Sequence, residues 1–250
     1  MSSEKTSAII IKTVDFSESS CITTLFTRDF GKISAIAKGC KRPKSAFESA
    51  IDLLAVCRIV FLHKTSDSLD ILTEAKLVRK FRASEKSLLH LYAGYYVGEL
   101  LNEFTETADK HLHLYDLAEL VLNELNDGGD VQRLVLRFEL MLLRLIGHLP
   151  ELAQCVETGR PIPETGKVSF GLLAGGVLST KARSGHKHVV QIQVETLRLY
   201  QAFADPGDKW RDYEIPRKVI GESRAILNRY ITHLLGHPLK MHKHLGALSS

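Results

Sequence analysis

The hydrophobic pattern changes its period near residue 82, and this change constrains the fold more than any other feature of the sequence. Before it, short runs rich in Ile, Val and Thr alternate with turn residues, as β-strands do. After it, apolar residues recur at intervals of three and four, which is typical of amphipathic helices. A chain that groups its strands before its helices is expected to be an α+β protein with more than one domain.

The first part of the chain is expected to form a small barrel. Five strands in about 75 residues, without a long intervening helix, fit a closed antiparallel sheet. An OB-type barrel has five strands, and an SH3-like barrel also fits the count. The strands are predicted at residues 8–14, 21–27, 33–38, 53–62 and 69–78.

The second part is expected to form a helical domain with an irregular insert. Ser84 and Ser87 can cap the first helix, and glycines after the second and third helices supply stop signals. The insert collects Gly and Pro and has two short candidate strands, at 168–170 and 177–178. The sequence therefore predicts a domain at residues 1–82 and a helical domain at 83–250 that includes the insert at about 151–187. The helices are predicted at residues 84–101, 111–126, 130–146, 190–204 and 216–235.

Several classes of protein lack support in the sequence. No apolar run reaches the roughly 18 residues of a membrane span, and residues 1–5 lack the order of a secretory signal. The four cysteines form no CxxC pair, so we expect free thiols and a cytoplasmic protein. Nucleotide-binding and hydrolase motifs are missing, and no histidine pairs with a cysteine at zinc spacing. We therefore expect no catalytic residue, no cofactor and no metal.

Charge is unevenly distributed along the chain. Residues 1–86 hold 15 Lys and Arg against 10 Asp and Glu, residues 87–149 hold 4 against 10, and the remainder holds 14 against 9. The sharpest feature is the basic segment at 38–45, where Gly and Pro favour an exposed loop after a strand. Such a loop suits contact with nucleic-acid phosphates. The residues predicted to bind DNA are Arg28, Lys32, Lys38, Lys41, Arg42, Lys44, Arg79, Lys80 and Arg82.

Two parts of this prediction have alternatives. The cluster around Arg79, Lys80 and Arg82 either extends a DNA track or keeps an exposed linker in solution. Aromatic rings that could stack on bases are Phe26, Phe30, Phe47 and Phe61, although Phe26 and Phe61 fit the core better.

The order of these features resembles the RecO family of recombination mediators. Residues 30–33 and 37–45 are similar to the family's "G…KGARRxKS" element, and residues 91–101 to its "YxxYxxELL" helix. Residues 137–150 are similar to "RFELxLLxxxGxxP". Weaker similarities follow at 169–176 and 238–240, so the resemblance covers almost the whole chain.

The chain departs from the family in the insert. Many members bind a structural zinc there through two CxxC pairs. The matching positions here are Cys155, Thr158, Ser179 and Ala182. A single thiolate cannot hold tetrahedral zinc, so the insert resembles a zinc finger without its ligands. It must be held by packing or remain mobile.

The resemblance implies a nucleoid-associated DNA repair and recombination protein that is not an enzyme. Family members bind single- and double-stranded DNA, anneal complementary strands, and help load recombinase onto DNA coated with single-stranded DNA-binding protein. The implied partners are DNA, RecR and the acidic C-terminal tail of the single-stranded DNA-binding protein. For that tail, the matched "RFEL" motif indicates Arg137, with Arg133 one turn earlier. The alternatives are an unrecognised nucleic-acid-processing enzyme and an adaptor that does not bind DNA.

Overall fold

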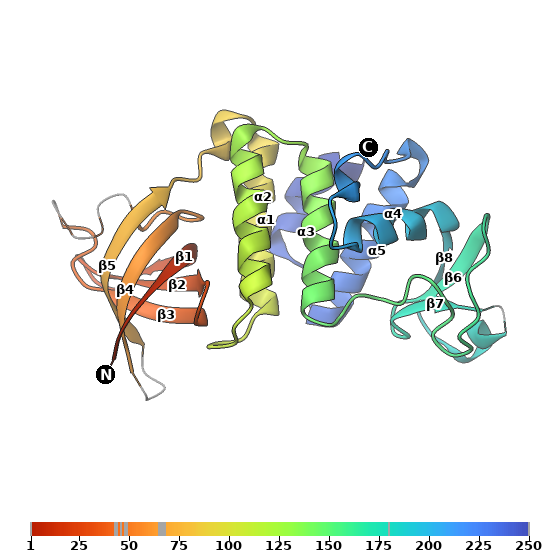
Figure 1. Ribbon diagram of the computed structural model, residues 1–250, viewed down its shortest axis with the longest axis horizontal. Helices are drawn as coiled ribbons and strands as arrows, with labels where there is room; N and C mark the ends of the chain where they lie inside the picture. Colours follow the sequence, from red (N-terminus) through yellow and green to blue (C-terminus); the bar gives the residue numbers. More distant parts are fainter. Residues whose placement is uncertain are drawn as a thin grey trace. The chain divides into compact units, whose positions relative to one another are not determined.

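The computed structural model describes residues 2–42, 45, 47, 50–64, 69–179 and 181–249. Contacts divide the chain into two compact units, residues 1–130 and 131–250. The first unit contains strands and two helices, and the second contains three helices and a small sheet (Figure 1). The predicted domain boundary at residue 82, which marks the change from strands to helices, stays a prediction.

The first unit is built on a closed five-stranded barrel, red to orange in Figure 1. The order around the barrel is β1-β2-β3-β5-β4, and a parallel pairing of β3 with β5 closes it. The predicted five-stranded OB-type barrel is therefore confirmed. Its strands are β1 (Ser2–Asp15), β2 (Cys21–Thr27), β3 (Gly31–Ala37), β4 (Val56–His63) and β5 (Asp70–Arg79).

Strand β1 is longer than the predicted segment because it serves two neighbours. Its first half, from Ser2 to Ile9, pairs with β4, and its second half, from Ala8 to Asp15, pairs with β2. A β-bulge between Ile10 and Lys12 lies in the part that pairs with β2. Bulges increase the bend and twist of a strand, which helps a sheet to close into a barrel. The apolar run of residues 8–11 is buried, whereas residues 2–5 at the start of β1 are mostly exposed and polar, so the sequence did not indicate the first part of the strand.

Two helices complete the first unit: α1 (Leu88–Phe104) and α2 (Leu112–Asp127). The side chain of Ser87 caps α1 by accepting a hydrogen bond from the backbone N–H of His90. Gly128 ends α2 in the left-handed conformation, with φ of 87°. Ser87 and the glycine stop were both predicted, because caps depend on local residue chemistry.

The second unit holds α3 (Val131–Leu145), α4 (Val194–Ala204), α5 (Arg217–Leu235) and a three-stranded sheet of order β7-β6-β8. The strands are β6 (Lys167–Gly171), β7 (Gly176–Leu178) and β8 (Val189–Gln193). β6 and β7 confirm the two candidate strands of the insert. The helix predicted from residue 190 is wrong at its start, since residues 189–193 pair with β6.

Among the described residues, three short 3-10 helices lie between these elements, and a longer one follows α5. They are η1 (Ala83–Glu85), η2 (Ala182–Gly185), η3 (Lys209–Arg211) and η4 (Lys240–Ser249). Within the described residues, no helix combines the length and apolar character that crossing a membrane requires.

A buried ion pair joins two helices of the second unit. Arg224 of α5 donates to the carboxylate of Glu139 on α3, and the two side chains are 3% and 0% exposed. Arg224 also donates to the side-chain oxygen of Asn228, at 3.2 Å. Removing one partner of a buried ion pair is strongly destabilising, so this pair stabilises the connection between α3 and α5.

Gly31 is required at the turn between β2 and β3. Its φ is 69°, and a Cβ atom there would lie 2.0 Å from the backbone oxygen of Asp109. We expect Gly31→Ala to lower the free energy of unfolding by at least about 2 kcal/mol, because the clash adds to the strain of a left-handed alanine. Urea denaturation measures the loss. Gly185→Ala is the control, since nothing lies within 4 Å of the Cβ it would add; equal stability of the two variants would contradict the prediction.

Candidate nucleic-acid interface

The predicted basic loop forms a tight turn directly after β3. Gly39 adopts a φ of 75°, and the backbone N–H of Arg42 donates to the Gly39 carbonyl at 3.0 Å. Lys38, Lys41 and Arg42 are exposed on this turn. Lys44, also predicted to bind DNA, lies outside the described residues. The turn therefore brings three of the four predicted loop cations together at the surface.

The basic loop rests against the β1–β2 hairpin. The backbone N–H of Lys41 donates to the Ser19 carbonyl at 3.1 Å, and that of Gly39 donates to the Ser20 hydroxyl at 3.3 Å. The Lys41 ammonium also lies 2.8 Å from a carboxylate oxygen of Asp15. These contacts hold the two loops together at one end of the barrel, and they offset part of the charge of Lys41.

Two cysteines add to the junction of the loops. The sulfur of Cys40 lies 2.7 Å from the sulfur of Cys21, which begins β2, and both are free thiols. Burial, together with the hydrogen bond and charge of Cys40, raises the pKa of Cys21 to about 12. Cys21 therefore stays protonated and acts as a small apolar group of the core, as the sequence predicted.

An exposed aromatic ring stands in the hairpin beside the basic loop. Phe16 is 60% exposed, although a large apolar side chain gains free energy from burial. Sequence reasoning treated residues 15–20 as a turn and missed this ring. The available signal was a phenylalanine inside an otherwise polar turn. The cations and Phe16 form a surface that we call the loop site, defined by Phe16, Lys38, Lys41 and Arg42.

The aromatic residues predicted as stacking candidates lie elsewhere. Phe26 and Phe61 are fully buried, as expected, and Phe47 is 5% exposed in the barrel core. The prediction for Phe47 is wrong, because a ring inside the core cannot stack on a base. Phe30 is half-buried and packs edge-on against Phe61, with ring centroids 5.3 Å apart.

Arg28 and Lys32 lie at the opposite end of the β2–β3 hairpin. The Arg28 guanidinium pairs with Asp116 of α2 at 3.1 Å, and this contact raises the pKa of Arg28. Lys32 donates to the Asn102 carbonyl in the last turn of α1 at 2.7 Å. Burial lowers the pKa of Lys32, although nearby glutamates act in the opposite direction. Both cations join the barrel to the helices of the first unit, and β2 separates them from the loop site by about 20 Å.

The cluster after β5 is the third predicted group of cations. Arg79 and Arg82 are exposed, whereas Lys80 pairs with Asp52 at 2.9 Å. The backbone N–H of Arg82 donates to the side chain of Asn126 on α2 at 2.7 Å. A DNA role for this cluster stays a prediction.

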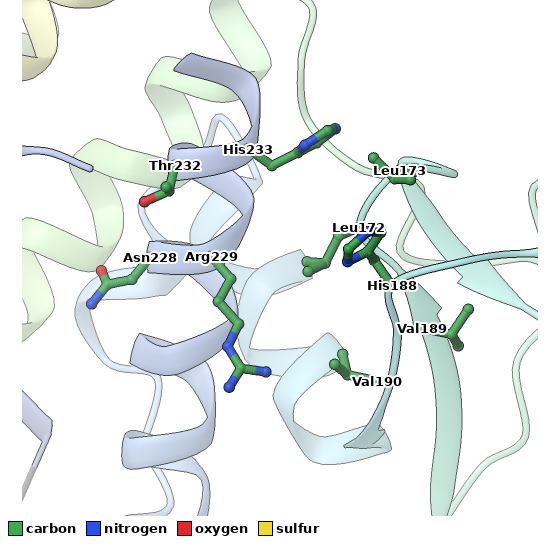
Figure 2. Close-up of a pocket in the computed structure, with 9 residues that line it drawn as sticks. All are labelled: Leu172, Leu173, His188, Val189, Val190, Asn228, Arg229, Thr232 and His233. Atoms are coloured by element: carbon green, nitrogen blue, oxygen red, sulfur yellow. The ribbon is translucent and has the colours of Figure 1, made fainter. Parts of the chain in front are cut away.

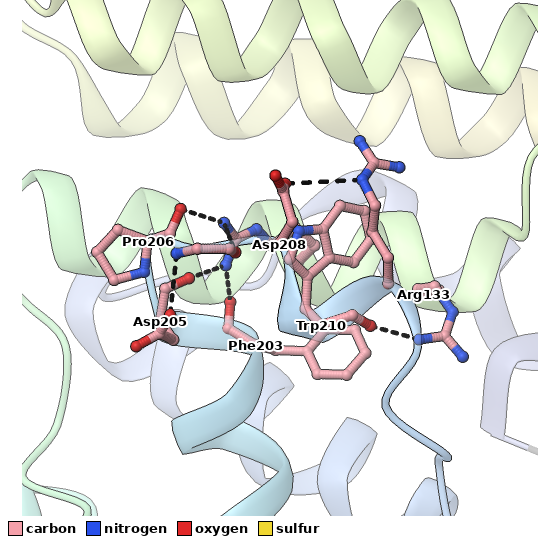
Figure 3. A network of polar contacts seen from close by, with 9 residues as sticks. Arg133, Phe203, Asp205, Pro206, Asp208 and Trp210 are labelled. Carbon is pink, nitrogen blue, oxygen red and sulfur yellow. Dashed lines mark hydrogen bonds and ion pairs between the residues drawn. The ribbon is translucent and has the colours of Figure 1, made fainter.

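Arg133 projects from α3 toward the chain that follows α4 (Figure 3), and Arg137 of the same helix donates to the Phe203 carbonyl near the end of α4. Arg137 is 5% exposed and donates to the backbone carbonyls of residues 203 and 205–207. Its guanidinium also lies 5.2 Å from the centre of the Trp210 ring. Arg133 donates to the carbonyls of Trp210 and Tyr213. Both side chains thus support the loop between α4 and α5, and a direct contact with a peptide stays a prediction.

A pocket of about 510 Å³ opens between α5 and the three-stranded sheet (Figure 2). Its wall on the sheet side is apolar except for His188, and its wall on the α5 side is polar or cationic. No carboxylate is among the residues that line it: Leu172, Leu173, His188, Val189, Val190, Asn228, Arg229, Thr232 and His233. An apolar wall facing an arginine suits a ligand that is both apolar and anionic.

The insert does not offer a set of zinc ligands. Cys155 accepts a hydrogen bond from the backbone N–H of Ser179 at 3.1 Å and packs with Leu178 and Ala182. Burial raises the pKa of Cys155, but hydrogen bonds from Thr158, Ser179 and Glu157 outweigh it and lower the pKa to about 6. The other three matched positions carry two hydroxyls and a methyl group, which do not complete a tetrahedral zinc site. The described part of the chain holds no group of three His, Cys, Asp or Glu residues placed for a metal ion.

Buried side chains and strand pairing connect the described residues of the insert. The small cluster of Cys155, Leu178 and Ala182 lies beside the sheet, and the β6–β7 and β6–β8 pairings connect its strands. That packing alone, without a metal, holds the insert stays a prediction.

The fold defines an α+β protein with an N-terminal OB-type barrel that carries cations on its loops. Residues 1–81 match the family model "Recombination protein O N terminal", and residues 85–243 match "Recombination protein O C terminal". The DNA repair protein RecO of Rhodopirellula baltica is 41% identical over 198 residues, which are 79% of this chain and 73% of that protein. The DNA repair protein RecO of Halalkalibacterium halodurans is 28% identical over 98% of this chain and 95% of its own. The chain belongs to the RecO family of DNA repair proteins.

The buried position of Arg137 predicts a structural role that can be measured. We expect Arg137→Ala to lower the free energy of unfolding by about 2–4 kcal/mol, because four carbonyls lose a charged donor and the side-chain packing is removed. Thermal or urea denaturation of the full chain measures this change. The control is Arg229→Ala, which removes an exposed arginine of α5. A loss of less than about 0.5 kcal/mol in Arg137→Ala, the usual limit for surface positions, would contradict the structural role.

Proposed function

We propose that the protein binds single- and double-stranded DNA through the loop site and anneals complementary strands without catalysing a reaction. In the same proposal, it helps load recombinase onto DNA coated with single-stranded DNA-binding protein, together with RecR. Membership of a family of DNA repair proteins supports this function. The single observation that carries it is the exposed Phe16 beside Lys38, Lys41 and Arg42 on adjoining loops of the barrel.

The two kinds of side chain have different tasks in binding. Lysine and arginine neutralise phosphates and release their counterions, which gives affinity that falls with salt. An aromatic ring stacks on an unpaired base with little dependence on sequence or salt. A site that combines them favours single strands, while its cations alone also attract a duplex. No bond is made or broken, so binding and charge neutralisation are sufficient to bring strands together.

Variants of the loop site separate these two tasks. We expect Lys41→Gln combined with Arg42→Gln to weaken binding to single-stranded oligo-dT by about tenfold and to reduce the salt slope by about 1.4, or 0.7 for each phosphate no longer neutralised. We expect Phe16→Ala to weaken binding by a similar factor with an unchanged slope, because stacking releases no counterions. Fluorescence anisotropy across a salt series measures both quantities.

A matched control variant has the same net charge as the loop-site double variant. Lys187→Gln combined with Lys209→Gln removes two exposed cations of the second unit and is expected to bind like the wild type. If the loop-site double variant also keeps its affinity and slope, the proposed site is wrong. Turnover of labelled DNA with Mg²⁺ would favour the alternative of a nucleic-acid enzyme, and absence of any oligonucleotide binding would favour an adaptor.

The same proposal includes a site for the acidic tail of the single-stranded DNA-binding protein. We propose that the tail binds in the pocket of Figure 2 rather than at the buried Arg137. Such a ligand needs an apolar wall and an accessible cation. Leu172 and Val190 belong to the wall, and Arg229 is exposed on α5 with no acidic residue lining the pocket.

A peptide experiment tests the assignment of this pocket. The probe is an acidic peptide that ends in an apolar residue with a free carboxylate. We expect Arg229→Glu to weaken its binding at least tenfold, because a cation becomes a repulsive anion. Arg217→Glu, an exposed position on the same helix outside the pocket, is the control. If Arg229→Glu binds normally while Arg133→Ala does not, the tail binds at the arginines of α3 instead.

A further inference from the structure

A second group of cations lies on the outer face of β1, β4 and β5, away from the loop site. Lys5, Arg58 and Lys76 are exposed, one on each strand. They line a groove of about 790 Å³ together with Arg28. Sequence reasoning selected Arg28 but passed over Lys5 and Arg58, because single cations in separate strands do not form a cluster in the sequence.

The register of the strands places these cations side by side. Ser7 of β1 is opposite Arg58 of β4, and Arg58 is opposite Lys76 of β5. The backbone N–H of Arg28 donates to the Ser7 carbonyl at 2.9 Å, so Arg28 continues the same row. Neighbouring strands are about 4.8 Å apart, so Arg58 and Lys76 present adjacent positive charges, and Lys5, two residues before Ser7 on β1, lies diagonally from Arg58.

This arrangement is unfavourable for the protein alone. Like charges on directly opposite strand positions destabilise a sheet. Among the described residues, no carboxylate forms an ion pair with Lys5, Arg58 or Lys76.

The acidic groups of the groove do not fully balance the positive charge of these three cations. Asp29 accepts a hydrogen bond from the Thr6 hydroxyl at 2.6 Å, and Glu74 pairs with none of the three. The charge of Arg28 is already offset by Asp116. Three cations therefore share the groove with two carboxylates, those of Asp29 and Glu74, and an anionic ligand would relieve the repulsion that remains.

We propose that this groove binds the phosphate backbone of a second nucleic-acid strand. The inference rests on the proposed function and extends it from one strand to two. The turn that carries Arg28 and the turn that carries Lys38 lie at opposite ends of the β2–β3 hairpin, which is about 20 Å long. Two strands held on one barrel at this separation would have much of their mutual repulsion neutralised before their bases meet.

The composition of the groove favours a nucleic acid over a protein. Protein-binding sites depend on buried apolar anchors at their centre. Here the apolar lining residues Ile59 and Ala75 are buried in the barrel, and Val60 is half-buried in the sheet. Spaced cations with hydroxyl groups between them match a repeating phosphate backbone instead.

Native mass spectrometry of the full chain with short oligo-dT tests the inference. We expect the wild type to bind two oligonucleotides. In the variant Arg58→Gln combined with Lys76→Gln, we expect the dissociation constant of the second oligonucleotide to rise about tenfold. The salt slope of the second step should fall by about 1.4, or 0.7 for each phosphate that the variant no longer neutralises. The variant Lys187→Gln with Lys209→Gln is the charge-matched control, and urea denaturation checks that the groove variant is folded.

The outcomes separate this inference from the proposed function. A groove variant that still binds two oligonucleotides, with a second dissociation constant within twofold of the wild type, overturns the second-strand site. A wild type that binds only one oligonucleotide also overturns the second-strand site, but it leaves the proposed binding at the loop site intact. A wild type that binds none contradicts the proposed function itself. A third outcome would make the groove a protein-binding site. In that case the wild type binds an acidic peptide but no second oligonucleotide, and the groove variant does not bind the peptide.

Discussion

Closure of the barrel is the constraint on which the rest of the first unit depends. β1 pairs with β2 and with β4, and the parallel pairing of β3 with β5 joins the remaining edges. Closure satisfies the backbone hydrogen bonds that open edges would leave unpaired. It also fixes the ends of the strands, so the β1–β2 hairpin and the loop after β3 meet at one end while the β2–β3 turn lies at the other. The positions of the two proposed DNA-binding surfaces follow from this geometry.

In the second unit, buried cations have a structural task. Arg137 holds the carbonyls that follow α4, and Arg224 neutralises Glu139 between α3 and α5. The "RFEL" motif therefore contains one residue that supports a loop and one that fixes helix packing. Buried charges are tolerated only when donors and acceptors are matched, which explains why these groups have several partners. A cationic residue in a recognisable motif can therefore have a structural role and does not necessarily bind a ligand.

Local features were predictable and long-range ones were not. The number of strands in the barrel, the Ser87 cap, the stop at Gly128 and the exposed turn at 38–42 depend on short-range chemistry, and each agrees with the structure. The roles of Arg28 and Lys32 could not be read, since their partners Asp116 and Asn102 are at least 70 residues away. The start of α4 was misread because residues 189–193 become a strand only by pairing with β6.

The sequence alone determined the order of strands before helices, the exposed basic turn and the absence of a complete set of thiolate ligands in the insert. These follow from periodicity, turn residues and donor chemistry, which neighbouring residues set. The tertiary structure alone decided which cations remain accessible. It pairs Arg28 and buries Arg137, it brings Phe16 beside Lys41, and it aligns Arg58 with Lys76. Accessibility depends on strand register and on contacts distant in the chain, and a linear pattern does not contain that information.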